Sequence, residues 1–308
     1  MSSAHPHHQE TVRGVGFALG AYLCWGLFPL YWKPLSSIAP LEILFHRIVW
    51  SALLLTGLLV YLRTHRVVLR AFTQPRVLLL FTASSLCLSA NWLTYIWAVN
   101  HDHVVEASLG YYINPLMNVV LGALFLNERL TRVQKAAIAL AAAGVAWLSF
   151  GVGQVPWIAL LLAVSFALYG LLRKTAKLAS LEGLALETFL LMPWALIGLG
   201  WLAKRGEAGI LHSDPLVTVL LVGAGFVTTV PLLFFAGAAR RLKLATLGVI
   251  QYLSPTLQFL LGVWLYHEPL GAERLAGFAM IWCALALYSV AGWRDYKRGQ
   301  ARLTGKAA

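Results

Sequence analysis

The sequence predicts an all-α integral membrane protein with ten transmembrane helices, arranged as two inverted five-helix repeats around a central cavity. Three observations predict it: apolar residues form long blocks, basic residues lie between those blocks, and one stretch of sequence recurs 140 positions later. Of the 308 residues, 59% are apolar and only 12% are charged, whereas soluble domains carry about 25% charged residues. With a mean hydropathy of +0.73, the soluble classes are excluded.

Ten apolar blocks follow one another along the chain, most of them close to the ~20 residues that a helix needs to cross a bilayer. They lie at residues 12–32, 43–62, 77–99, 104–126, 133–150, 155–172, 183–203, 216–238, 245–266 and 273–292. The first block continues into Lys33 without a small-residue cleavage site, so we expect a retained helix and not a signal peptide. Prolines, which fit the first turn of a helix, stand at four expected helix starts: Pro40, Pro75, Pro156 and Pro215.

Basic residues predict the orientation. Ten spans put both termini on the same side of the membrane. If that side is the cytoplasm, nineteen of the 24 Lys and Arg residues lie inside, four lie outside and Arg47 lies within a span. Cytoplasmic loops are enriched in positive charge. We therefore expect a multi-pass inner (plasma) membrane protein with a cytoplasmic tail at residues 1–11 and a basic cytoplasmic tail at residues 293–308. The net charge of +12 is explained by this placement, so the expected partner is the lipid bilayer and not a nucleic acid.

An internal repeat divides the chain. Residues 111–130 (YYINPLMNVVLGALFLNERL) recur as residues 251–270 (QYLSPTLQFLLGVWLYHEPL), with six identities in twenty positions. We therefore predict two five-helix repeats, at residues 12–150 and 155–292. Because five is an odd number, the second repeat enters the membrane from the opposite side, and inverted repeats of this kind are typical of alternating-access carriers. The alternative is that duplication only produced a larger helical bundle.

Several short motifs resemble a known family. They are Trp25-Gly26, His46-Arg47, Asn91-Trp92, the segment 106–115 (EASLGYYINP) and the segment 125–129 (FLNER). Over about residues 10–295 the chain resembles the drug/metabolite transporter superfamily of EamA type, and most closely its RarD-like branch of chloramphenicol-sensitive or chloramphenicol-resistance permeases. The resemblance implies a basket of ten helices around a central cavity, with the fifth and tenth helices outside it. It also implies transport of metabolites or drugs, with export favoured.

Polar residues recur at helical spacing on the fourth span and on its counterpart, the ninth. Positions i, i+3 and i+7 share one face of a helix. The two sets are Tyr111, Asn114 and Asn118 on the fourth span and Gln251, Ser254 and Gln258 on the ninth. They lie beside Pro115 and Pro255, which free backbone carbonyls for a ligand. We expect both sets to line the substrate cavity; the alternative is hydrogen bonding between helices.

Two further pairs are candidates for contact with a substrate. Asn91 and Tyr95 lie one turn apart on the third span. Trp25 on the first span and Tyr169 on the sixth occupy matching positions within aromatic stripes, 144 residues apart. The alternative for Asn91 and Tyr95 is hydrogen bonding between helices, and the alternative for Trp25 and Tyr169 is ordinary packing.

Charged residues inside spans are costly unless they are paired or hydrated, so they mark functional positions. Arg47 in the second span and Glu187 in the seventh occupy matching positions, but the inversion places them toward opposite faces. We therefore expect Glu106, at the outer end of the fourth span, to be the neighbour of Arg47. Arg47 stays protonated and suits a fixed anchor for a carboxylate, whereas Glu187 can exchange protons. The alternative for Glu187 is a structural pair with Arg173 or Lys174.

The sequence carries no catalytic motif and no metal or cofactor site. It lacks the H-E-x-x-H, G-x-S-x-G and Walker A patterns, and its three cysteines lie in separate apolar blocks. We therefore expect neither an enzyme nor a cofactor. Small residues at 136–144 and at Gly16 and Gly20 predict close helix contacts, within one chain or between the chains of a homodimer.

These features together predict an inner-membrane carrier that moves small organic metabolites or drug-like molecules by alternating access. Export rests on the family resemblance alone. The alternative is a membrane-embedded ligand sensor or assembly partner, which would bind a ligand in the same cavity without moving it.

The charge distribution predicts which segments can be labelled from outside the cell. In intact cells, an impermeant thiol reagent should label cysteines placed at Asp102 and Glu207 and should miss cysteines placed at Arg66, Arg132 and Arg241. The variants are made in a background without the three native cysteines. Labelling at position 132 from outside would contradict the orientation.

Overall fold

A computed structural model describes residues 5–125, 130–151, 153, 155–239, 241, 242 and 250–303, and the elements in these ranges are all helical. They are α1 (His5–Gly26), α2 (Phe28–Trp32), η1 (Lys33–Leu35), α3 (Pro40–Tyr61), α4 (His65–Ala71), α5 (Pro75–Asn100), α6 (Val104–Phe125), α7 (Arg132–Gly151), α8 (Trp157–Thr175), α9 (Ser180–Lys204), η2 (Gly209–Leu211), α10 (Pro215–Ala239), α12 (Leu253–Leu260), the π-helical η3 (Leu261–Leu265) and α13 (Ala272–Leu303).

Seven helices of the described chain are long and apolar enough to cross a membrane: α3, α5, α6, α7, α9, α10 and α13. An eighth span results if α1 and the α2–η1 segment, which are bent by 44° relative to one another, count as one. The remaining apolar helices, Trp157–Arg173 and Leu253–Leu265, are shorter. The predicted all-α membrane class is thereby confirmed.

Each predicted apolar block is helical over most of its described residues, with breaks such as the turn at Leu27. The four prolines stand at helix starts as predicted: Pro40, Pro75 and Pro215 are the first residues of their helices, and Pro156 is the N-cap of α8. The described parts of both predicted tails are helical, because α1 already begins at His5 and α13 continues to Leu303. The short helix α4 was not predicted.

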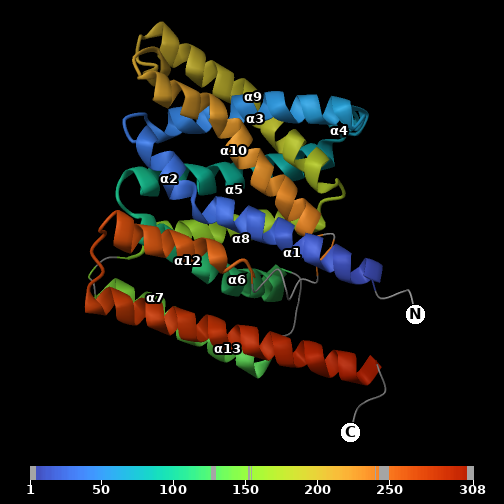
Figure 1. The fold of residues 1–308 in the computed structure, drawn as a ribbon, viewed down its shortest axis with the longest axis vertical. Helices are drawn as coiled ribbons and strands as arrows, with labels where there is room; N and C mark the ends of the chain where they lie inside the picture. Colours follow the sequence, from blue (N-terminus) through green and yellow to red (C-terminus); the bar gives the residue numbers. More distant parts are fainter. Residues whose placement is uncertain are drawn as a thin grey trace.

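The helices lie side by side in successive layers along the long axis of the molecule (Figure 1). α3 packs against α9 and α10, α8 against α5 and α6, and α12 against α1 and α6, while α7 and α13 form a separate pair. This pair makes up one end of the stack. The helices run across this stack, so the two ends of the bundle lie at the left and right of Figure 1. The right end holds the start of α1, the end of α13 and the helix α4.

The outer surface of the bundle is apolar. Large side chains such as Leu79, Phe150 and Trp194 are 75%, 88% and 69% exposed. A soluble protein rarely exposes apolar side chains on this scale, whereas a bilayer provides them with an apolar solvent. The surface of the helices is therefore built to face lipid.

Glycines bring particular helices close together. A Cβ atom on Gly225 of α10 would clash with the backbone of Trp50 and Ser51 on α3. On α7, a Cβ atom on Gly144 would lie 3.1 Å from the carbonyl oxygen of Gly277 on α13, and one on Gly20 would lie 3.1 Å from Phe234 of α10. The predicted small-residue contacts at Gly144 and Gly20 are thus made within the chain. A homodimer stays a prediction.

The close approach of α10 to α3 predicts that Gly225→Ala destabilises the protein by about 1–3 kcal/mol, the usual cost of overpacking. Gly57→Ala is the matched control, because a Cβ atom at Gly57 meets open space. Thermal unfolding in detergent compares the two variants with the parent protein. Equal unfolding midpoints for the two variants would show that α3 and α10 are not in close contact.

Candidate functional site

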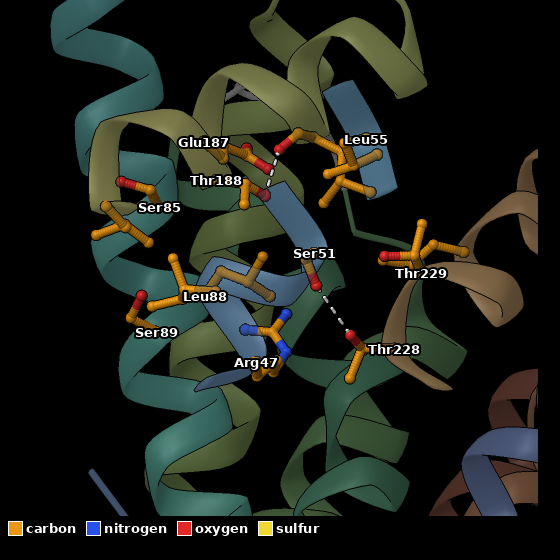
Figure 2. Close-up of a pocket in the computed structure, with 14 residues that line it drawn as sticks. Arg47, Ser51, Leu55, Ser85, Leu88, Ser89, Glu187, Thr188, Thr228 and Thr229 are labelled. Atoms are coloured by element: carbon orange, nitrogen blue, oxygen red, sulfur yellow. Dashed lines mark hydrogen bonds between the residues drawn. The ribbon is translucent and has the colours of Figure 1, made fainter. Parts of the chain in front are cut away.

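A polar cavity lies within the apolar bundle, between two helices of the first half of the chain and two of the second (Figure 2). The cavity has a volume of about 20 Å³, which is enough for about one water molecule. Its lining consists of Arg47, Ile48, Ser51 and Leu55 on α3, Ser85, Leu88 and Ser89 on α5, Leu184, Glu187, Thr188 and Leu191 on α9, and Thr228, Thr229 and Leu232 on α10.

Arg47 reaches the cavity from the second turn of α3 and is only 7% exposed. Its guanidinium carbon lies 4.1 Å from the ring centroid of Trp92 on α5. Among the described residues it has no hydrogen-bond partner and no ion pair, and its Nε atom is buried without an acceptor. Arg47 is therefore a buried positive charge that is stabilised on one face by an indole ring and makes no direct ion pair. The carboxylate of Glu187 acts on it electrostatically across the cavity.

Glu187 lies on α9, is 1% exposed and lines the same cavity. Its carboxylate accepts a hydrogen bond from the hydroxyl of Ser84 and lies 3.8 Å from the Arg173 guanidinium. The Tyr169 hydroxyl also approaches this carboxylate. Arg173 in turn donates to the carbonyl oxygen of Ser180 at 3.3 Å. Arg173 thus provides a positive charge beside Glu187. A structural pair of these two residues was the alternative to a proton-exchanging Glu187.

Hydroxyl groups occupy the cavity wall between the two charged residues. Ser51 and Thr228 lie 3.3 Å apart, oxygen to oxygen. Thr228 also donates to the carbonyl oxygen of Ala224 at 2.8 Å, and Thr188 donates to that of Leu184 at 2.8 Å. The protons of Thr228 and Thr188 are thus engaged by carbonyls of their own helices. The Ser51 hydroxyl has only long contacts, to Thr228 and to the carbonyl oxygen of Gly225 on α10 at 3.4 Å, so its proton is available to a ligand.

Three of the residues predicted for the substrate cavity form one network among α5, α6 and α8. The amide of Asn91 donates to the carbonyl oxygen of Leu162 at 3.0 Å and to Ser165 Oγ at 3.1 Å, and it accepts from the Tyr111 hydroxyl at 3.4 Å. The rings of Tyr95 and Tyr111 meet edge to face, with centroids 5.7 Å apart. For Asn91 the structure shows hydrogen bonding between helices, which was the alternative.

Three others lie together between α1 and α12. Gln258 donates to the carbonyl oxygen of Trp25 at 3.0 Å and to Ser254 Oγ at 3.4 Å. The Trp25 ring packs against Phe235, with centroids 5.7 Å apart. The Gln258 hydrogen bond joins the ninth predicted span to the first.

The remaining candidates are placed separately. Asn114 on α6 is buried, and its Oδ1 atom has no partner in the described chain. The Oδ1 atom of Asn118 faces Gly170 of α8, and Gln251 lies half-buried just before α12. None of the ten residues predicted to line the substrate cavity lines the pocket of Figure 2. Their role toward a substrate stays a prediction.

The expectation that Glu106 is the neighbour of Arg47 was wrong. Glu106 accepts a hydrogen bond from the amide of Ile158 at 3.1 Å and lies 3.8 Å from His103. Its position in the first turn of α6 places it beside the start of α8, where free backbone N–H groups attract a carboxylate. The sequence argument also placed Arg47 and Glu187 apart, whereas the structure brings both to one cavity without a direct ion pair.

Comparison with known proteins identifies the family. Residues 12–150 match the model of the EamA-like transporter family. A protein named "Uncharacterized transporter" from Vibrio cholerae is 46% identical over 287 residues, which cover 93% of this chain and 95% of that protein. "Protein RarD" from Escherichia coli is 43% identical over 280 residues, which cover 91% and 95%. The chain belongs to the EamA-like transporter family.

The resemblance seen in the motifs is thereby confirmed. A solved crystal structure shares the fold of this EamA-like transporter with a TM-score of 0.56 at 19% identity, over 93% of this chain and 98% of the other. At that identity the likeness shows the fold alone.

None of the hydroxyl residues that line the cavity was among the predicted site residues. The signal that could have found them is a four-residue spacing: Arg47 and Ser51 share one face of α3, and Ser85 and Ser89 share one face of α5. A hydroxyl residue one turn away from a charged residue in an apolar span lies on the same face of the helix, so it is a candidate to line the same cavity.

The ion pair in this EamA-like transporter predicts a strong coupling between Arg173 and Glu187. Arg173→Gln leaves a buried carboxylate without its cation and should cost about 3 kcal/mol. Adding Glu187→Gln should recover at least ~1 kcal/mol, which a double-mutant cycle of thermal unfolding measures. In the exposed pair of Arg205 and Glu207, Arg205→Gln should cost at most ~0.5 kcal/mol. Additive effects at Arg173 and Glu187 would contradict the pair.

Proposed function

We propose that this chain is an inner-membrane carrier that exports small organic metabolites or drug-like molecules by alternating access. The observation that carries the proposal is the polar cavity of Figure 2, which is enclosed by α3 and α5 of the first half and α9 and α10 of the second. Relative movement of the two halves would open such a cavity to one face and then to the other.

The packing of the helices supports an inverted repeat of ten spans. Three contacts join equivalent elements: α3 with α9, α6 with α12, and α7 with α13. Other contacts occur in equivalent pairs, since α1 packs against α10 as α8 packs against α5, and α12 packs against α1 as α6 packs against α8. This is the pattern that a two-fold axis between the halves produces. The rings of Tyr112 and Tyr252, which match in the repeat, stack with centroids 6.4 Å apart.

The placement of the chain ends supports the proposed orientation. The first described residues of α1 and the last of α13 lie at one end of the bundle (Figure 1), as an even number of spans requires. Cytoplasmic placement of this end follows from the basic residues. The described helix of the proposed ninth span, Leu253–Leu265, is 13 residues long, and the start of the predicted block at 245–266 lies outside the described residues.

Polar contacts join the two halves at both ends of the bundle. At the end proposed to face outward, Lys33 pairs with Asp102, and the Glu268 carboxylate accepts from the amides of Val104 and Val105 at 2.6 and 2.8 Å. At the opposite end, Arg241 pairs with Glu10 at 2.8 Å. We assign this arrangement to an occluded state, since a cavity of about 20 Å³ holds no metabolite.

The names of the relatives also favour transport, since the Vibrio cholerae protein is called a transporter. Export is inferred from the family resemblance. A ligand sensor, the second candidate, would share the cavity but would not change the distribution of any metabolite. Release of metabolites therefore separates the two functions.

Asn114 provides the test. Because its Oδ1 atom has no partner in the described chain, Asn114→Ala should leave folding intact while lowering metabolite release at least fivefold. Asn91→Ala removes three hydrogen bonds between helices and should instead lower the unfolding midpoint. Metabolites released by overexpressing, deletion and variant cells are compared at equal protein level in the membrane. If the medium of overexpressing and deletion cells is the same, the chain is not an exporter.

A further inference from the structure

We propose that the cavity binds a small organic monoanion, with its carboxylate on Arg47 and its apolar body toward the leucines of α9 and α10. The inference deepens the proposed carrier function by naming the chemical class of the substrate, and it rests on that function. Binding itself can be measured without transport, so the two can fail separately.

The charges of the cavity do not balance. Its two ionisable lining residues are Arg47 and Glu187. Two cations, Arg173 at 3.8 Å and Arg47 farther away, share the single carboxylate of Glu187. Glu42, on the same helix as Arg47, faces His46 at 3.8 Å and the amide of Ile210 at 3.4 Å. One positive charge is therefore left inside the apolar bundle, where an unpaired charge is costly. An anion entering the cavity would compensate it.

Arg47 is also held in a fixed orientation. Trp92 covers one face of the guanidinium, and its indole ring is itself packed against Phe28, Trp32 and Tyr95 at centroid distances of 5.7, 6.0 and 6.3 Å. The N–H groups lie in the plane of the guanidinium and none is used by a described residue. A planar group with free parallel N–H donors matches a carboxylate, which accepts two of them at once.

The surroundings of Arg47 select among anions. Only one cation is uncompensated, and the protons of the nearby Thr228 and Thr188 hydroxyls already go to helix carbonyls. A phosphate with two charges would lack donors here, whereas a carboxylate needs one guanidinium. The rest of the lining includes Ile48, Leu55, Leu88, Leu184, Leu191 and Leu232, which suits an apolar substrate body once the halves separate.

Binding by the purified protein in detergent tests the inference. Thermal unfolding is followed with sodium formate, acetate or benzoate against formamide, acetamide or benzamide, with sodium chloride keeping ionic strength constant. At least one carboxylate should raise the unfolding midpoint while its amide does not. Arg47→Gln should weaken that binding at least tenfold, the effect of losing a charge-assisted hydrogen bond. Arg66→Gln, which alters an exposed arginine, should leave it unchanged.

Ser51→Ala gives a second variant if Arg47→Gln does not fold. It removes a hydroxyl one turn from Arg47 and should weaken carboxylate binding about threefold while leaving any amide binding unchanged. The proposal is overturned if no carboxylate stabilises the protein more than its amide, or if Arg47→Gln binds as the parent does. Release of only neutral or cationic metabolites by overexpressing cells would overturn the anion site and leave the carrier standing. Carboxylate binding without any release of metabolites would leave the anion site standing and overturn the carrier function.

Discussion

A bilayer offers no water to polar groups, so every polar side chain in a span must be satisfied by the protein itself. This constraint explains most of the polar contacts inside the bundle. Asn91 bonds to α8, Glu187 to Ser84 beside Arg173, and Gln258 to the backbone of α1. One buried oxygen each of Glu187 and Gln258 has no partner among the described residues. Arg47 is the exception among the charged residues of the cavity, because an indole ring is its main contact. The proposed carboxylate site rests on this difference between Arg47 and the other polar residues of the bundle.

Much of the fold could be predicted from the sequence because its signals are local. A block of apolar residues requires a helix in lipid, and Pro40, Pro75 and Pro215 stand at helix starts because a first turn tolerates a missing N–H. The charged residues of the cavity were equally visible, since any Arg or Glu inside a span stands out. The composition of a single span was enough to find them.

Contacts between distant spans could not be predicted in the same way. Glu106 was expected near Arg47 because both lie toward one face of the membrane, but the nearest free donors of Glu106 are the amides at the start of α8. Ser51 and Thr228 come from helices far apart in the sequence, and they meet because Gly225 lets α10 approach α3. Since a hydroxyl can bond to its own helix, such residues give little signal in a sequence.

The two halves meet where function is proposed. α3 and α9, which are equivalent in the proposed repeat, pack against one another, with Arg47 on one and Glu187 on the other. In the proposed mechanism of alternating access, relative movement of the halves exposes the cavity at this contact to one face of the membrane and then to the other. The proposed carboxylate anchor lies at the same contact.

Alternating access is tested most directly by distances between spin labels on α3 and α9 in lipid vesicles. One pair, at Leu41 and Trp201, reports on the end proposed to face outward, and another, at Tyr61 and Ser180, reports on the opposite end. The account predicts two distances for each pair, with populations that shift in opposite directions at the two ends when a bound carboxylate is added. A single, unchanged distance at both ends would contradict it.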